Sequence, residues 1–225
     1  MSSMMGGKKQ SGIMVVDREV LLGERYFREF SPASEYDYES IILGNYRFAN
    51  RREAEEDPFL KQPVGYCVVV NPKRGTILTY RRAEEEASYE EGRLRGRWSV
   101  GIGGHVEPPD SDEPNPIEAS MMREIREELE WNGRLELQLL GYINDDVDMV
   151  GKVHFGLLYL LQTRASIIKP RSKEIAEAGM VAMAELGEMM REGSRVFEGW
   201  SRIAYDPVIR LMKTGDLFPK DAPAL

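Results

Sequence analysis

The sequence predicts a mixed α+β fold in which helices cover the faces of a β-sheet. Its strand-like segments come in hairpins, and one amphipathic helix is inserted between two groups of strands. Strands and helices do not alternate regularly, which argues against a doubly wound parallel sheet. The chain has 225 residues, 42% of them hydrophobic and 30% charged, which is typical of a globular protein with one good core.

The first sixty residues carry no pattern that indicates chemistry. Residues 1–12 lack an apolar signal core and are expected to form a disordered leader. Residues 13–22 are predicted as a strand and residues 38–56 as a helix, which Asp57-Pro58 ends. The predicted organisation is a single domain over residues 13–225, with an N-terminal extension at 13–60 and a core at 62–212.

The predicted core opens with a β-hairpin. Residues 64–70 form a continuous apolar run, residues 71–75 carry the turn signals Asn, Pro and Gly, and residues 76–82 return as a strand. The other predicted elements are an acidic loop at 84–91, strands at 97–102, 135–143, 152–162 and 179–183, and helices at 116–130, 184–192 and 201–212.

The bulk charge and composition limit the possible partners. A formal net charge of -8 argues against binding to duplex nucleic acid, which needs a basic surface. No apolar run approaches the ~18–20 residues of a membrane span, so no membrane partner is expected. Cys67 is the only cysteine, which excludes an intrachain disulfide and fits a reducing cytoplasm.

An acidic ridge on the helix at 116–130 is the main candidate for function. Glu124, Glu127 and Glu128 are spaced i, i+3 and i+4, so they share one helical face beside its apolar stripe. Such a face is explained if a divalent cation neutralises it. The alternative is an ordinary surface helix with salt bridges such as Arg123 to Glu127, each worth ~0.2–0.5 kcal/mol. Two adjacent glycines after the strand at 97–102 favour the cation, because they let a cation or phosphate approach the backbone.

This ensemble resembles the Nudix box, the signature of the Nudix hydrolases. Residues 123–128, Arg-Glu-Ile-Arg-Glu-Glu, match the R-E-U-x-E-E core of that pattern, in which U is a bulky apolar residue. Gly103-Gly104 and Glu107 resemble its opening, and Trp131 matches its closing apolar position. The Gly-Gly-His opening and the later Glu-Gly-Trp-Ser-Arg at 198–202 resemble a branch described as predicted phosphoesterases. The resemblance implies a Nudix-type α/β/α sandwich, with the box helix packed on a mixed sheet.

The box departs from the family pattern at three points. Asn115 stands where the family has a glutamate eight residues before the core arginine, and Glu130 stands where it has a glycine. The loop between residues 109 and 114 is about five residues longer than the usual spacing. Three acidic residues of this loop can take over from the missing glutamate: Asp110, Asp112 and Glu113.

The resemblance implies roles for the box residues. Glu127, Glu128 and the Gly103 carbonyl are expected to bind Mg²⁺ or Mn²⁺, and Glu124 to act as the general base or as a further ligand. Arg123 is expected to hold the glutamates in place. The implied reaction is the attack of water on phosphorus in a diphosphate bond of a small, nucleotide-derived substrate. Dimers are common in the family, so a homodimer is possible.

Further residues are weaker candidates for substrate binding. They are Arg81, Arg82, His105, Glu174 and Glu177, and for each a plain surface or structural role is an alternative. His154 is expected to be structural. The acidic loop at 144–148 can bind a second metal, although solvation is the simpler interpretation.

Two other functions remain open. The stretched loop and Asn115 leave room for a catalytically weak Nudix-fold module that senses a nucleotide. The acidic helix can also be only salt-bridged, in a structural domain.

Overall fold

In the computed structural model, described residues are 12–84, 94–131, 135–164, 168–193 and 195–214. A large mixed sheet runs through the molecule, in the order β12-β5-β4-β10-β9-β2, with four further strands attached to this path. Its strands are β1 (Gly12–Asp17), β2 (Glu29–Pro32), β3 (Arg47–Asn50), β4 (Leu60–Asn71), β5 (Thr76–Arg82), β6 (Trp98–Ser99), β7 (Gly101–Ile102), β9 (Leu135–Asn144), β10 (His154–Thr163) and β12 (Ile175–Ala182).

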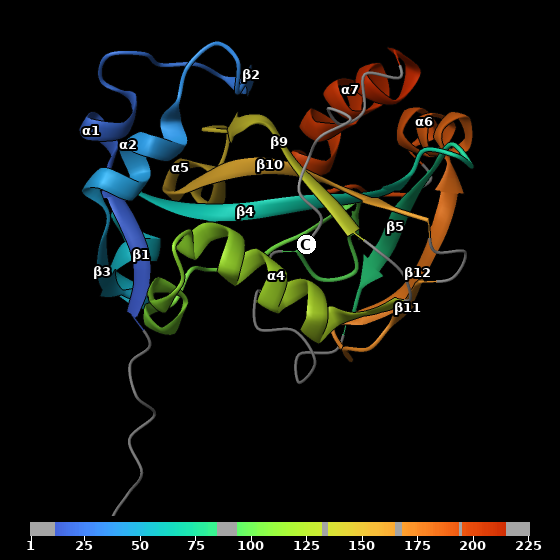
Figure 1. Cartoon of the computed structure of the whole chain (residues 1–225), viewed down its shortest axis with the longest axis horizontal. Helices are drawn as coiled ribbons and strands as arrows, with labels where there is room; N and C mark the ends of the chain where they lie inside the picture. The colour runs from blue at the N-terminus through green and yellow to red at the C-terminus, as the bar shows by residue number, and fades with distance from the viewer. Residues whose placement is uncertain (1–11, 85–93, 132–134, 165–167, 194, 215–225) are drawn as a thin grey trace, which may run out of the picture.

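Helices lie on both faces of this sheet (Figure 1), and a small second sheet pairs β8 (Leu129–Trp131) with β11 (Ile168–Pro170). The helices are α1 (Arg18–Leu22), α2 (Tyr38–Asn45), α3 (Arg51–Glu56), α4 (Pro116–Glu128), α5 (Met149–Val153), α6 (Met183–Glu192) and α7 (Gly199–Thr214), with a 3-10 helix at Pro108–Asp112. No helix in these ranges combines the length and hydropathy that a membrane crossing requires.

Strand β4 is the centre of the core because all twelve of its residues are buried. Successive side chains of a strand point to opposite faces, and β4 uses both faces. Cys67 and Val69 belong to the cluster that includes the apolar stripe of α4, whereas Val68 and Val70 belong to the cluster formed with α6 and α7. The predicted α+β class and the α/β/α layering are therefore confirmed.

The N-terminal extension joins the sheet of the core. Strand β1 pairs with β3 and with the beginning of β4, and β2 pairs with the edge strand β9. Both pairings support our proposal that residues 13–225 form one domain. Of the predicted leader, only Gly12 is described, and it lies in β1. The acidic loop at 84–91 likewise lies outside the described residues, apart from Glu84.

Two secondary-structure predictions in the extension are wrong. The predicted strand at 13–22 is β1 followed by the short helix α1, and the predicted helix at 38–56 is α2, β3 and α3 in succession. Residues 47–50 become a strand because β1 provides an antiparallel partner for them. The helix predicted at 116–130 ends earlier, at Glu128, because Leu129 and Glu130 pair with β11.

The core hairpin is as predicted, with β4 and β5 joined at a turn that ends in Gly75. The backbone of Gly75 has a φ of 63°, in the left-handed region that favours glycine. The Asn71 side chain accepts a hydrogen bond from the Arg74 amide at 3.2 Å, which fixes the turn.

A buried lysine of β4 and an arginine of the extension both bind the loop before α5. Lys61 is completely buried, and its Nζ lies 2.9 Å from Asp146 Oδ1 and 2.9 Å from the Gly151 carbonyl oxygen. Asp146 also pairs with Arg18 of α1 at 2.6 Å. The expectation that this acidic loop is solvated is therefore wrong for Asp146, whose carboxylate is committed to two cations.

Candidate active site

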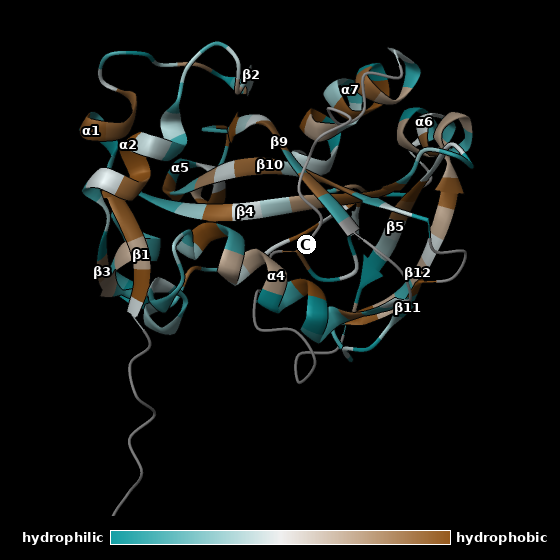
Figure 2. Cartoon of the chain, viewed as in Figure 1, coloured by the Kyte–Doolittle hydropathy of each residue, from teal (hydrophilic) through white to brown (hydrophobic). Residues whose placement is uncertain are grey.

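The helix that carries the acidic ridge begins where the sequence predicts. Asn115 caps α4: its side-chain oxygen accepts hydrogen bonds from the amides of Ile117 at 3.1 Å and Glu118 at 3.2 Å. Pro116 takes the first helical position, where no backbone donor is needed. The departure from the family glutamate at this position therefore has a structural consequence, since Asn115 starts the helix. Figure 2 shows that hydrophilic residues gather in the second half of α4.

The acidic ridge and the glycine bend meet at one pocket. Its volume is about 960 Å³, and its lining includes Glu124, Glu127, Glu128 and the bend at Gly103 and Gly104, which follows β7. A Cβ on Gly103 would lie 2.2 Å from the Gly65 carbonyl oxygen, and a Cβ on Gly104 2.4 Å from Glu124 Cδ. Glycine is needed at Gly103, where a side chain would meet the backbone of β4, whereas at Gly104 a side chain would meet the flexible end of Glu124.

Burial changes the electrostatics of the ridge. Glu128 is 8% exposed, and burial raises the pKa of its carboxyl to about 8, against the opposing effect of Arg82 and with the help of nearby Glu124, Glu174 and Glu198. Burial also raises the pKa of Glu124, which the neighbouring Arg123 partly offsets. The pocket therefore concentrates carboxyl groups that a positive charge would stabilise.

The donor atoms of this pocket suit a hard divalent cation. The Oε2 atom of Glu128 is buried and has no hydrogen-bond partner among the described residues, an arrangement that costs free energy unless a ligand is present. Carboxylate and carbonyl oxygens are the ligands that Mg²⁺ and Mn²⁺ prefer. In the described ranges, however, no three His, Cys, Asp or Glu side chains are arranged as a ready-made metal cluster. A bound cation would have to draw the ridge carboxylates together.

Arg123 is held from the lengthened loop. Its Nε and Nη2 atoms donate to the two carboxylate oxygens of Asp110, each at 3.2 Å, and its Nη1 donates to Glu124 Oε1 at 2.7 Å. Asp110 is buried and faces inward because it forms a capping box with Glu107 in the 3-10 helix. Of the three acidic loop residues that the sequence offers, the structure therefore joins Asp110 to the box arginine.

We expect Asp110→Ala to lower the rate of any metal-dependent reaction of this pocket about 10- to 100-fold, because Arg123 and Glu124 lose their support. Steady-state kinetics of the two variants Asp110→Ala and Asp112→Ala check this. Asp112 lies on the same loop but is exposed, so its variant should keep the full rate. Equal rates for the two variants would contradict a supporting role for Asp110.

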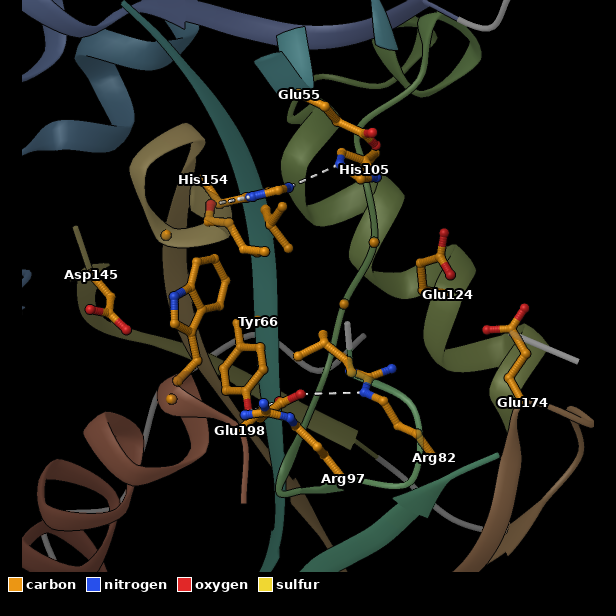
Figure 3. Close-up of a pocket in the computed structure, with 18 of the residues that line it drawn as sticks. Glu55, Tyr66, Arg82, Arg97, His105, Glu124, Asp145, His154, Glu174 and Glu198 are labelled. Carbon is orange, nitrogen blue, oxygen red and sulfur yellow. Dashed lines mark hydrogen bonds and ion pairs between the residues drawn. The ribbon is translucent and has the colours of Figure 1, made fainter. Parts of the chain in front are cut away.

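The structure brings some of the weaker candidates to the pocket and leaves others outside it. Arg82, His105 and Glu174 line the pocket, as Figure 3 shows. Arg81 and Glu177 are not in the lining. Arg81 pairs with Glu84 at 2.5 Å, and Glu177 is an exposed residue of β12.

His105 and His154 form a pair across the pocket (Figure 3). Their Nε2 atoms are 3.1 Å apart, and His154 Nδ1 lies 2.7 Å from the Val150 carbonyl oxygen, to which it donates. Burial, together with the nearby His154 and Arg51, lowers the pKa of His105 to about 3. His105 is therefore neutral at physiological pH, and it can reach a substrate only as a hydrogen-bonding group.

Several lining residues carry no signal in a single sequence. They come from the extension, the central strand, the β5–β6 region and the beginning of α7: Arg51, Glu55, Tyr66, Arg97, Glu198 and Trp200. Glu198 and Trp200 belong to the Glu-Gly-Trp-Ser-Arg segment, which is recognisable as a motif. Nothing in that motif indicates that Glu198 contacts Arg82.

The fold is layered, and its pocket lies between a glycine bend and an acidic helix. Comparison with known proteins places this arrangement among the hydrolases and identifies the family. The NUDIX domain model matches residues 61–199, so the chain belongs to the Nudix family. The family membership predicted from the box is confirmed.

Known relatives agree with this result over most of the chain. Protein YmaB of Bacillus subtilis (strain 168) is 32% identical over 170 residues, which are 73% of this chain and 79% of YmaB. The crystal structure of Tm1382, a presumed Nudix hydrolase, superposes with a TM-score of 0.71 at 29% identity, covering 89% of this chain and 99% of that one. A Nudix hydrolase from Alicyclobacillus acidocaldarius shares the fold, with a TM-score of 0.52 at 14% identity over 68% of this chain and 90% of that one.

Proposed function

We propose that this chain is a pyrophosphohydrolase that needs Mg²⁺ or Mn²⁺. Its reaction is the attack of water on phosphorus in a diphosphate bond of a nucleoside diphosphate derivative or a related phosphoanhydride. The observation that carries the proposal is the convergence of three acidic side chains of α4 and the Gly103-Gly104 bend on one pocket. Membership of the Nudix family supports the same reaction class.

Different box residues would bind the cation and accept a proton. Glu127, Glu128 and the Gly103 carbonyl would hold the cation, and Glu124 would be a further ligand or the general base. When bound, the cation neutralises diphosphate charge and favours the ionisation of a water molecule. Burial raises the pKa of Glu124, and a raised pKa makes its carboxylate a stronger base. Arg123 fixes the Glu124 carboxylate by donating to it.

The remaining pocket residues suit a small phosphorylated substrate. Arg82 offers a guanidinium, which binds phosphate oxygens in pairs, and the neutral His105 offers a hydrogen bond. The volume of about 960 Å³ is within the range of ligand pockets and exceeds what a diphosphate alone would fill. We therefore favour a substrate with an organic group attached to the diphosphate.

A panel assay tests the function. The purified chain is mixed with Mg²⁺ or Mn²⁺ and with dinucleoside polyphosphates, nucleotide sugars, nucleoside triphosphates or ADP-ribose, and phosphate-ester products are measured. We expect cleavage of at least one class, and none when the cation is chelated. Tight nucleotide binding without turnover would favour the sensor module, and neither result would favour a structural domain. A homodimer stays a prediction, which the molar mass in solution tests.

A further inference from the structure

Two arginines meet at the edge of the pocket beyond the acidic ridge. Strand β5 pairs with β6 with Arg81 opposite Trp98, and the Arg82 amide donates to the Arg97 carbonyl oxygen at 3.0 Å. Arg82 and Arg97 are therefore directly opposite each other, so their side chains leave the same face of the ladder. Both line the pocket, and Figure 3 shows them together beside Glu198, away from Glu124.

A buried carboxylate fixes one member of this pair. Glu198 is 4% exposed, and its Oε1 accepts hydrogen bonds from Tyr66 Oη at 2.7 Å and Ser99 Oγ at 2.5 Å. Its Oε2 accepts from Arg82 Nε at 3.3 Å. The Arg82 guanidinium also lies over the Tyr80 ring, 5.4 Å from its centroid. Arg82 is thus held on several sides, and its position is set before any ligand arrives.

The second arginine has no such partner. Arg97 is exposed, and within the described part of the chain its guanidinium makes no ion pair or hydrogen bond. Like charges directly opposite each other on neighbouring strands are destabilising. Glu198 forms an ion pair with Arg82 at 3.3 Å, whereas no described side chain forms one with Arg97. An anion between the two guanidinium groups would remove the remaining repulsion.

We propose that Arg82 and Arg97 form a subsite for a phosphoryl group of the substrate, and that Glu198 is the positioning residue for Arg82. The proposal rests on the proposed function, because the phosphoryl group would belong to the substrate whose other phosphoryl group lies at the acidic ridge. Guanidinium groups bind phosphate oxygens in a planar, paired geometry, so two of them suit this anion better than a carboxylate or a neutral group. None of the three residues belongs to the box.

Titration of the full chain with inorganic pyrophosphate in a chelator tests the subsite without catalysis or cation. We expect Arg97→Ala to weaken pyrophosphate binding about tenfold, as expected for the loss of a charge-assisted contact. Arg126→Ala is the matched control, since Arg126 is an exposed arginine of α4 outside the pocket lining, and its affinity should stay within about twofold. Absence of pyrophosphate binding by the unsubstituted chain, or equal effects of the two variants, would overturn the subsite.

Glu198→Gln tests the positioning role in the same titration. The amide oxygen can still accept from Tyr66 and Ser99, but the charge that holds Arg82 is gone. Removing a negative charge beside an anion would by itself tighten binding, whereas loss of the Arg82 position weakens it. We expect weaker binding, and in turnover a higher KM with a nearly unchanged kcat. Tighter binding, or an unchanged KM, would overturn the positioning role.

The subsite and the proposed enzymatic activity can each be contradicted without the other. Arg97-dependent binding of pyrophosphate by a chain that cleaves no substrate would leave the subsite standing and remove the enzymatic proposal. Cleavage with a KM that Arg97→Ala does not change would do the opposite.

Discussion

Replacing Glu128 with glutamine is expected to lower kcat/KM at least about 100-fold, because the substitution keeps the shape of the side chain and removes a buried charge from the proposed cation site. The same variant is expected to be more stable than the unsubstituted chain when no cation is present. The buried Glu128 carboxylate has an oxygen without a partner among the described residues, and a neutral amide is less costly to bury. We expect a gain of about 1–3 kcal/mol in the free energy of unfolding at pH 8.

Steady-state kinetics and urea denaturation in a chelator check the two effects together. Glu130→Gln is the matched control, because Glu130 follows the same helix but is exposed and lies outside the pocket lining. A Glu128→Gln variant that keeps its activity would remove Glu128 from the site. A variant that loses both activity and stability would show that Glu128 serves the fold.

Replacing Asp146 with asparagine is expected to cost about 3 kcal/mol of stability at pH 7, because it leaves the buried Lys61 ammonium and Arg18 without their counter-charge. Asp17→Asn is the control: its partner Arg47 is 51% exposed, and an exposed pair is worth at most about 1 kcal/mol. Chemical denaturation of the two variants measures the difference. A loss at Asp146 no larger than that at Asp17 would contradict the account.

The pH dependence of this loss follows from two pKa shifts. Burial lowers the pKa of Lys61 to about 8, although Asp146 opposes the shift. Between that value and its ordinary pKa near 10.5, the folded chain binds fewer protons than the unfolded chain, so stability rises with pH there. Asp146 raises the pKa of Lys61, so in Asp146→Asn the lysine should lose its proton at a lower pH than in the unsubstituted chain. A neutral lysine needs no counter-charge, so the penalty of Asp146→Asn should shrink as the pH rises towards 8 and change little above it.

The titration of Asp146 affects the stability of the chain at acidic pH. Burial alone would raise the pKa of its carboxyl, but hydrogen bonds from Arg18 and Lys61 outweigh burial and hold the pKa below its ordinary value of 3.8. The stability from this shift is present above that ordinary value and is lost as the pH falls below it. The unsubstituted chain should therefore lose stability in acid more steeply than Asp146→Asn does, which denaturation between about pH 5 and pH 2 would reveal.

Local signals allowed the site helix and the core hairpin to be predicted from the sequence. Asn115 and Pro116 mark the beginning of α4, and the residues of the β4–β5 turn act on their immediate neighbours, so their effect does not depend on the rest of the fold. The three ridge carboxylates also follow from helical spacing alone.

Features that depend on distant partners could not be predicted. Residues 47–50 fall within the imperfect helical period of residues 38–56, and only pairing with β1, more than thirty residues earlier, makes them a strand. Asp110 could not be chosen over Asp112 or Glu113 until the 3-10 helix turned it inward. The contact between Arg82 and Glu198 spans 116 residues of sequence, and no local pattern reports it.

The central claim is that the ridge of α4 holds one divalent cation against the Gly103 bend, and a Mn²⁺ titration followed by electron paramagnetic resonance tests it most directly. We expect about one Mn²⁺ per chain for the unsubstituted protein and for Glu130→Gln, and at least about tenfold weaker binding for Glu128→Gln. Mn²⁺ binding that Glu128→Gln leaves unchanged, or no binding by the unsubstituted chain, would contradict the claim.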